Sequence, residues 1–323
     1  MEKEEQKMAV KELFMNGHFV PSERGMIPVQ SHGFALSAGC LEGICGYWKE
    51  REQEIYLFRL REHFERLLQS CKILEISLLY TIDRLIEISI ELIKRNKLRQ
   101  NVYLRPWAYK ADRTTGAYLH DLIDRFILTV EPRENHIDTI GLSCGISSWW
   151  RIDNNAIPVQ AKTVPARAIS DYIQDEARSK GFDAAIVLTR DGHVSGGSAE
   201  NIFLVINGKL VTPTPTDGIL SGITRGTIME LAQRELGRIP QERQIDRTEL
   251  YTAEEIFLCG TDAQIAPVIQ VDHRDIGNGQ IGPICSALQK RYFEVVYGHL
   301  PCYAAKWCTP VYSGIPQYSE TAV

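Results

Sequence analysis

The sequence has little in the way of long apolar runs or basic tracts, and no secretory leader is expected. No stretch approaches about 18 uninterrupted apolar residues, the length that a transmembrane helix requires, so no membrane span is predicted. The amino-terminal segment MEKEEQKMAVKE is highly charged without an apolar core, which argues against a signal peptide and for a frayed tail. Lys plus Arg number 36 against 41 Asp plus Glu, and neither half of the chain is basic, so nucleic acid is not an expected partner.

Cysteine pairs and metal-ligand clusters are also missing. The eight cysteines form no CxxC pair, and several lie in apolar runs such as EEIFLCG. The eight histidines occur singly, and none pairs with Cys, Asp or Glu at ligand spacing. We therefore predict reduced, mostly buried thiols in a cytoplasmic protein, and no metal site.

The remaining composition is that of an ordinary globular protein, with 44% hydrophobic and 24% charged residues. A length of 323 residues predicts two domains. The segment ISSWWRIDNNAIP, which begins at residue 146, has little periodicity and is the expected junction. We predict a smaller N-terminal α/β domain at 1–145, an interdomain loop at 146–157 and a larger C-terminal domain at 158–323.

Strands and helices alternate along both halves, which predicts an α+β or α/β fold. Two Asn-Gly pairs, at 16–17 and 207–208, predict tight turns, the first of them inside a hairpin at 12–20. Helices are expected at 61–76, 82–97, 166–180, 224–236 and 284–297, and strands at 54–60, 101–109, 125–132, 136–144, 182–189, 200–206 and 254–260.

Residues 277–282 spell GNGQIG and match the dinucleotide-binding pattern GxGxxG. That interpretation requires a buried strand before the glycines and an acidic residue about 20 positions later. The preceding segment VDHRDI is short and polar, so we interpret Asn278-Gly279 as a tight turn between short strands.

Lys162 lies in AIPVQAKTVPA, a segment with no other charged residue. Most lysines are solvated surface groups, and this is the simpler interpretation. The alternative is a desolvated amine with a lowered pKa, which can form a Schiff base with a carbonyl compound.

Three further features could bind an anion. The loop GILSGITRG, residues 218–226, opens a predicted helix, and free amides at a helix start favour an anion, although Ser221 or Thr224 could simply cap that helix. The turn GTDAQ at 260–264 follows an apolar strand, where a ligand contact and a plain turn are equally common. Arg59, inside the apolar run YLFRL, needs an acidic or phosphate partner if it points inward. A lysine that can form a Schiff base, together with residues that bind an anion, is the set of residues that pyridoxal phosphate requires.

The chain resembles the fold-type IV pyridoxal-phosphate enzymes, whose fold is like that of D-amino-acid aminotransferase, and among them the branched-chain-amino-acid aminotransferases. The resemblance runs from about Leu13 to Tyr312. Its motifs are CLEGICGYW, LFRLREHFERLLQSCKIL, YLRPWAY, ISSWWR, IPVQAK, SAENIFLV, GILSGITRG and FLCGTDAQIAPV.

This resemblance implies a two-domain fold, a homodimer whose subunits share each site, and an amino acid or 2-oxo acid as substrate. Lys162 then corresponds to the catalytic lysine, and Glu42 falls in the loop that shapes the substrate pocket. The implied cofactor-binding residues are Arg59, Arg167, Gly196, Leu220, Ile223, Thr224 and Thr261, and the implied substrate-pocket residues are Leu36, Leu41, Gly43, Tyr103, Arg105 and Asp262.

The sequence departs from the family pattern at several of these positions. Gly196 stands where the family has a glutamate that pairs with the pyridine nitrogen of the cofactor, and Arg167 stands where a tyrosine contacts its phenolic oxygen. Leu36 and Leu41 replace aromatic residues, and Cys45 replaces an arginine. Three functions therefore stay open: transamination, another pyridoxal-phosphate reaction such as racemisation, elimination or decarboxylation, and a non-catalytic or cofactor-free relative.

Overall fold

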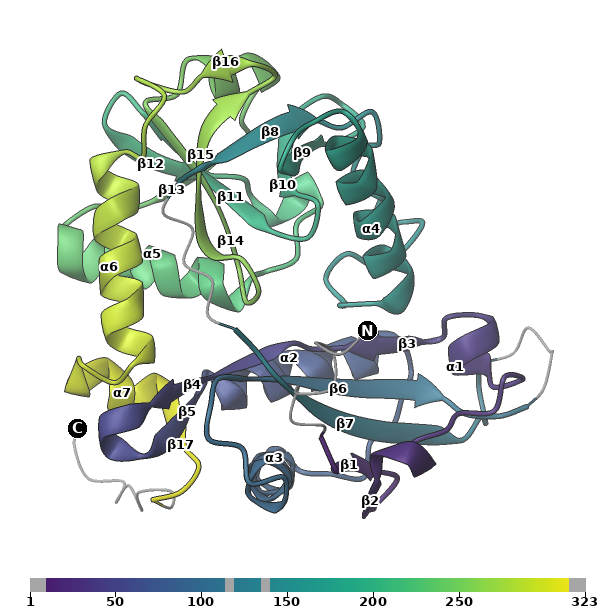
Figure 1. Cartoon of the computed structure of the whole chain (residues 1–323). Coiled ribbons are helices and arrows are strands. Elements are labelled where there is room, and N and C mark those ends of the chain that lie inside the picture. The colour runs from purple at the N-terminus through teal and green to yellow at the C-terminus, as the bar shows by residue number, and fades with distance from the viewer. Residues whose placement is uncertain (1–9, 114–118, 135–139, 314–323) are drawn as a thin grey trace, which may run out of the picture.

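The computed structural model describes residues 10–113, 119–134 and 140–313, which form two lobes, each built on one β-sheet (Figure 1). The strands of the first sheet run antiparallel in the order β17-β5-β4-β6-β7-β1-β2, and β3 also pairs with β6. These strands are β1 (Glu12–Met15), β2 (His18–Pro21), β3 (Gly39–Leu41), β4 (Ile44–Lys49), β5 (Glu54–Phe58), β6 (Val102–Lys110), β7 (Asp124–Pro132) and β17 (Cys308–Pro310).

Helices α1 (His32–Ala35), α2 (Leu60–Ile73) and α3 (Ile82–Arg95) complete the first lobe. The helical period places the apolar residues of α2 and α3 on one side of each helix, where they pack on the sheet in a common core. Helix α2 also contacts the second lobe, through Arg66 and Ser70.

The second sheet is mixed, with the order β10-β9-β8-β15-β14-β11-β12-β13 and with β16 paired to β15. Its strands are β8 (Leu142–Ile146), β9 (Ala184–Leu188), β10 (Val194–Gly197), β11 (Asn201–Ile206), β12 (Lys209–Thr212), β13 (Gln241–Glu242), β14 (Glu255–Gly260), β15 (Gln264–Val271) and β16 (Arg274–Asp275). Helices α4 (Val164–Ser179), α5 (Ile223–Leu236), α6 (Pro283–Val296) and α7 (Pro301–Trp307) follow the chain order. Short 3-10 helices lie at Ser22–Arg24, Glu50–Glu52, Pro215–Asp217 and Arg247–Tyr251.

One cluster of buried apolar residues spans both lobes. Cys45, Tyr47 and Phe58 of the first lobe pack with residues of α5, α6 and β14, and α7 closes the cluster with Trp307. After α7 the chain returns to the first sheet as β17, paired with β5. No described helix is long and apolar enough to cross a membrane.

The sheets divide the chain differently from the predicted domains. The predicted strand at 136–144 was misplaced, because β8 begins at Leu142 and pairs in parallel with β15 and β9 of the second sheet; residues 135–139 lie outside the described part. The second sheet therefore begins before residue 146, whereas β17 belongs to the first sheet although it lies beyond residue 158.

The glycine-rich GNGQIG segment forms a turn, as predicted, between the short strand β16 and the helix expected at 284–297. Gly277 and Gly279 have positive φ, the amide of Gly279 donates to the carbonyl oxygen of Ile276, and α6 begins at Pro283. The only regular structure just before it is the two-residue strand β16, so the buried strand of a dinucleotide site is missing from this described segment.

Candidate active site

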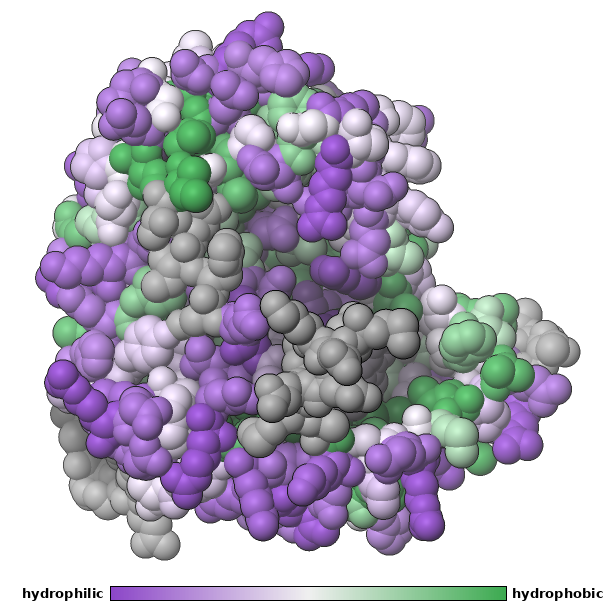
Figure 2. Space-filling model, in the orientation of Figure 1, coloured by the Kyte–Doolittle hydropathy of each residue, from purple (hydrophilic) through white to green (hydrophobic). Residues whose placement is uncertain are grey.

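A cavity lies between the two lobes, and Figure 2 shows a recess there that is bordered largely by hydrophilic residues. Most of its lining comes from the second lobe: the segment before α4, the first turns of α4 and α5, and the β10–β11 and β14–β15 turns. Leu41 and Arg66 contribute from the first lobe. Its space is about 1050 Å³ including the open mouth, the size expected of a small-molecule site.

Lys162 lines this cavity with its main chain fixed on both sides. Its amide donates to Oγ of Ser70 on α2 (3.1 Å), and its carbonyl oxygen accepts from the amide of Leu41 (3.0 Å). Thr163 then caps α4, accepting from the amide of Ala166. These bonds fix the start of the lysine side chain at the junction of the lobes.

The side chain of Lys162 is partly buried in the wall of the cavity. Burial lowers the pKa of Lys162, and the charge of Glu42 opposes this effect. Among the described residues no carboxylate lies within ion-pair distance of its Nζ. A lysine in this state loses its proton more readily than a solvated one and can act as a nucleophile.

A buried ion cluster of Glu42, His63 and Arg66 lies beside Lys162. The carboxylate of Glu42 is fully buried and accepts from Nδ1 of His63 (2.9 Å) and from Nε (2.6 Å) and Nη2 (2.8 Å) of Arg66. The charge of Arg66 and these hydrogen bonds hold the pKa of Glu42 far below its usual value despite burial. Burial lowers the pKa of His63, and Nδ1 of its ring is the donor because the ionised Glu42 can only accept. Nη1 of Arg66 donates to the carbonyl oxygen of Ser221 (3.0 Å), which ties α2 to the loop before α5.

The start of α5 offers main-chain amides to the cavity. Gly222 is the N-cap residue, and no side chain caps this helix, so neither Ser221 nor Thr224 has the capping role considered from the sequence. Leu220, Ile223 and Thr224 all line the cavity. Because the first amides of a helix have no partner within the helix, this end favours a bound anion.

Arg59 stands beside α5 but does not itself line the cavity. It is the N-cap residue of α2, with a φ of 51°, and its guanidinium lies over the ring of Trp307. Nε donates to Glu62 (2.8 Å) and Nη1 to Oγ1 of Thr227 (3.0 Å), one turn beyond Thr224. The side chain therefore brings a positive charge next to the start of α5.

The β14–β15 turn brings Thr261 to the opposite side of the cavity. The carbonyl oxygen of Thr261 accepts from Sγ of Cys45 (3.2 Å) and from Nη1 of Arg133 (3.2 Å). Arg133 also donates to the carbonyl oxygen of Asp262 and contacts Cys45. An arginine from the end of β7 thus lies next to Cys45, the position at which the resemblance leads one to expect an arginine.

Of the six predicted substrate residues, all of which the structure describes, Leu41 lines the cavity and the other five do not. Leu36 is exposed. Gly43 and Tyr103 touch, because a Cβ atom at position 43 would overlap the Tyr103 hydroxyl, and the Arg105 guanidinium lies over the Tyr103 ring at 5.1 Å. Burial raises the pKa of Tyr103, which keeps its hydroxyl protonated. The side chain of Asp262 is 85% exposed.

Arg167 and Gly196, the two departures from the family pattern, differ in their access to the cavity. Arg167, on the first turn of α4, lines it and pairs with Asp171 (3.0 Å), while half of its side chain is exposed. Gly196 is buried behind the lining, where a Cβ atom would lie 2.5 Å from the carbonyl oxygen of Glu200 and 3.5 Å from Nη2 of Arg151.

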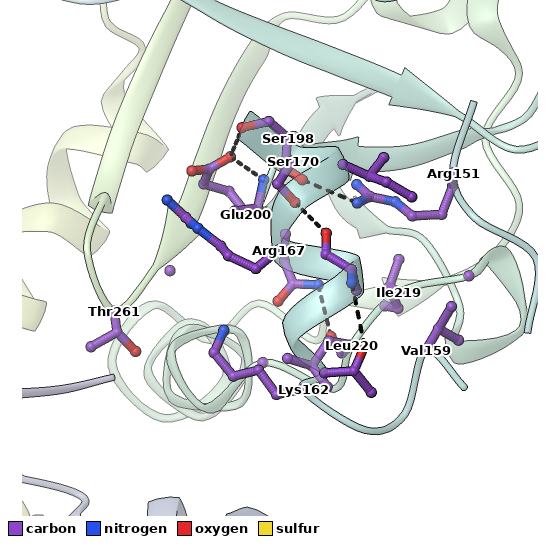
Figure 3. Close-up of a pocket in the computed structure, with 18 of the residues that line it drawn as sticks. Arg151, Val159, Lys162, Arg167, Ser170, Ser198, Glu200, Ile219, Leu220 and Thr261 are labelled. Atoms are coloured by element: carbon purple, nitrogen blue, oxygen red, sulfur yellow. Dashed lines mark hydrogen bonds between the residues drawn. The ribbon is translucent and has the colours of Figure 1, made fainter. Parts of the chain in front are cut away.

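Sequence reasoning missed three charged residues that line the cavity: Arg66, Arg151 and Glu200. Arg66 follows Arg59 by seven residues on α2, so helical spacing was a usable signal. Arg151 and Glu200 lie in irregular segments, where spacing carries no information. Figure 3 shows the side chains of Lys162, Arg167, Glu200 and Thr261 on the same side of the site.

Comparisons with known proteins show the family of this chain. The sequence profile of the family described as amino-transferase class IV matches residues 39–271. A probable branched-chain-amino-acid aminotransferase of Aquifex aeolicus is 41% identical over 93% of this chain and 96% of its own length. The branched-chain-amino-acid aminotransferase of Escherichia coli K12 is 34% identical over 88% of this chain and 93% of its own.

Solved structures give the same result. The branched-chain aminotransferase of Thermoproteus uzoniensis with norvaline has a TM-score of 0.90 and 36% identity, covering 94% of this chain and 100% of that one. The pyridoxal-phosphate form of the Thermobaculum terrenum branched-chain amino acid aminotransferase has a TM-score of 0.90 and 35% identity, covering 94% and 99%. The chain belongs to the class IV aminotransferase family.

Proposed function

We propose that this protein is a pyridoxal-phosphate-dependent aminotransferase of the branched-chain type, with Lys162 as the residue that binds the cofactor covalently. One observation carries the proposal: the partly buried, unpaired amine of Lys162 lies in the same cavity as the uncapped start of α5 and Thr261. The relatives described above support the substrate class.

The residues present fit pyridoxal phosphate. Its aldehyde needs an amine that is not held by an ion pair, which Lys162 provides. Its phosphate dianion needs amide and hydroxyl donors near positive charge, and Ile223, Thr224, Thr261 and Arg59 are placed to supply them. When bound, the cofactor supplies an electron sink for the charge left at Cα of an amino acid.

The protein's own side chains transfer the proton and bind the substrate. Lys162 takes the Cα proton of the substrate on Nζ, and its lowered pKa keeps a neutral amine available for that step. Tyr103 presents a protonated hydroxyl and Arg105 a positive charge for a substrate carboxylate. Leu41 adds apolar surface to the cavity, as a branched aliphatic side chain requires.

A cytoplasmic homodimer completes the proposal. All eight cysteines are free, and Sγ of Cys40 and Sγ of Cys71 lie 3.6 Å apart in a hydrogen bond rather than a disulfide, which suits a reducing compartment. The relationship to the branched-chain aminotransferases supports a dimer with a shared site.

The direct test is transamination of leucine, isoleucine and valine with 2-oxoglutarate, followed as glutamate formed. We expect activity in the wild type and a loss of at least about a hundredfold in Lys162→Ala, because a missing general base costs that much. Lys72→Ala, which changes an exposed lysine on α2, is the matched control and should keep wild-type rates. Equal rates in both variants would contradict the proposal.

Another pyridoxal-phosphate reaction is the second candidate, and Arg167 favours it. A guanidinium now lines the cavity where the resemblance leads one to expect a tyrosine. Incubating the loaded protein with single amino acids, without a 2-oxo acid, separates the two. Continued turnover to racemised, decarboxylated or eliminated products would favour this candidate over transamination.

A further inference from the structure

The described lining of the cavity is strongly basic and contains one carboxylate. Arg66, Arg151, Lys162 and Arg167 contribute four basic groups, whereas Glu200 is the single acidic residue among the described residues that face the cavity. An anion-binding site explains the excess of positive charge, but it does not explain a glutamate placed among these groups.

The carboxylate of Glu200 is only half satisfied. Its Oε2 accepts from the amide of Ala199 (2.9 Å) and from Oγ of Ser198 (3.3 Å). Within the part of the chain that the structure describes, no group donates to its Oε1, and no Lys or Arg lies within ion-pair distance of the carboxylate. In Figure 3 both bonds run to one oxygen, and the other points away from Ser198, on the side where Arg167 and Thr261 lie.

The neighbouring main chain is shaped around this carboxylate. A Cβ atom at Gly197 would lie 2.5 Å from Oε2 of Glu200, so a side chain at position 197 would displace it. A Cβ atom at Gly260 would make an ordinary contact of 3.8 Å with Cγ of Glu200, so glycine is not required there. The bare Gly197 and the two donors therefore match the position of the carboxylate.

Arg151 is the other charged residue at this end of the cavity that could contact a ligand. Each of its three guanidinium nitrogens already donates a hydrogen bond to the protein. Nε donates to Oγ of Ser195 (3.1 Å), Nη1 to the carbonyl oxygen of Ser198 (3.1 Å) and Nη2 to that of Gly197. Burial lowers the pKa of Arg151 to about 10, and the charge of Glu200 opposes this effect. Arg151 thus fixes the segment 195–198 and fills the space beside Gly196.

We propose that Glu200 is the carboxylate that accepts a hydrogen bond from the protonated pyridine nitrogen of pyridoxal phosphate in this protein. The proposal rests on the proposed function, since it needs the cofactor in this cavity. A protonated ring nitrogen is a cation, and pyridoxal-phosphate enzymes set its charge with one ionised side chain. Glu200 has the free acceptor that this requires, whereas position 196 has neither a side chain nor room for one.

The test measures the nitrogen itself. The protein is loaded with pyridoxal phosphate labelled with 15N in the ring, and the 15N chemical shift is followed against pH for the wild type, Glu200→Gln and Gly197→Ala. Asp175→Asn, which removes an exposed carboxylate on α4, is the charge-matched control. Gly197→Ala retains Glu200 but displaces its carboxylate, so the test does not depend on one variant.

We expect a protonated nitrogen near neutral pH in the wild type and in Asp175→Asn. In Glu200→Gln and Gly197→Ala its pH midpoint should fall by about one to three units, the usual effect of removing a neighbouring opposite charge. An unprotonated nitrogen in the wild type, or an unchanged midpoint in both variants, would overturn the assignment while leaving the proposed function intact. If the wild type takes up no cofactor, the proposed function and this inference fail together.

Discussion

Single glycines set the positions of several side chains to which we assign a role. Position 43 requires glycine because the hydroxyl of Tyr103 occupies the space that a Cβ atom would fill. We expect Gly43→Ala to displace Tyr103 and to raise KM for amino acids by roughly tenfold or more, corresponding to about 1.4 kcal/mol of lost binding. Steady-state kinetics checks this, and unchanged KM values would show that Tyr103 does not contact substrate.

Replacing Gly196 with glutamate would restore the residue typical of the family, but the main chain leaves no room for that side chain. A Cβ atom there would lie 2.5 Å from the carbonyl oxygen of Glu200. We expect Gly196→Ala to lower the free energy of unfolding by about 1–3 kcal/mol, as overpacking does. Urea denaturation measures this value, and a variant as stable as the wild type would show that the 196–200 turn adapts.

The lowered pKa of Lys162 has a measurable consequence. Because the amine is partly buried, it should lose its proton below the usual value of 10.5, so its reaction with an acylating reagent should reach half of its maximal rate at a lower pH than that of an exposed lysine. Peptide mapping after brief labelling of the apoprotein reports Lys162 and the exposed Lys72 in one sample. Identical pH profiles would mean that Lys162 is solvated.

At the level of elements, the start of α5 depends on close packing that only glycine allows. A Cβ atom at Gly222 would overlap Oδ1 of Asn201, whose amide group donates to the carbonyl oxygen of Leu220. We expect Gly222→Ala to weaken cofactor binding at least about tenfold, because the amides that face the phosphate would move. Gly226→Ala, in open space on the same helix, is the control, and it should stabilise the protein by about 0.5–1 kcal/mol. Equal cofactor affinity in the two variants would contradict this role for the helix start.

Helix α2 joins the buried Glu42 to the second lobe. Removing one partner of a buried pair costs about 3–5 kcal/mol, and we expect Glu42→Gln to lose that much free energy of unfolding at neutral pH. Because the folded-state pKa of Glu42 lies below its unfolded value of 4.5, its stabilisation is present above that value and is lost as pH falls toward the folded pKa. Denaturation at pH 7 and in acid should therefore show the difference shrink in acid, and a constant difference would contradict the charge argument.

The sequence predicted the long elements better than the short ones. Helices α3, α4, α5 and α6 begin and end within two residues of their expected positions, and α2 ends three residues earlier than expected, because each has a periodic pattern or clear end signals. Strand β15 escaped notice because its sequence QIAPVIQV contains a proline, and β10, VSGG, because it is half glycine. The spacing of Lys162, Thr224 and Thr261 along the chain could not show that they face one cavity, since only the packing of the lobes brings them together.

Across the whole molecule, the cavity is held by contacts between lobes. Ser70 and Leu41 hold Lys162, Arg66 holds Ser221, and Cys45 contacts Thr261. The site therefore exists only when both lobes are folded and docked. A cofactor bound there contacts both lobes and should stabilise them as a unit.

The central claim is that Lys162 binds pyridoxal phosphate covalently. The most direct measurement is the visible absorption spectrum of the purified protein with added pyridoxal phosphate, before and after borohydride reduction, followed by peptide mass mapping. The structure predicts a yellow protein whose reduced adduct maps to Lys162 and is missing in Lys162→Ala. A colourless protein, or an adduct retained in that variant, would contradict the account.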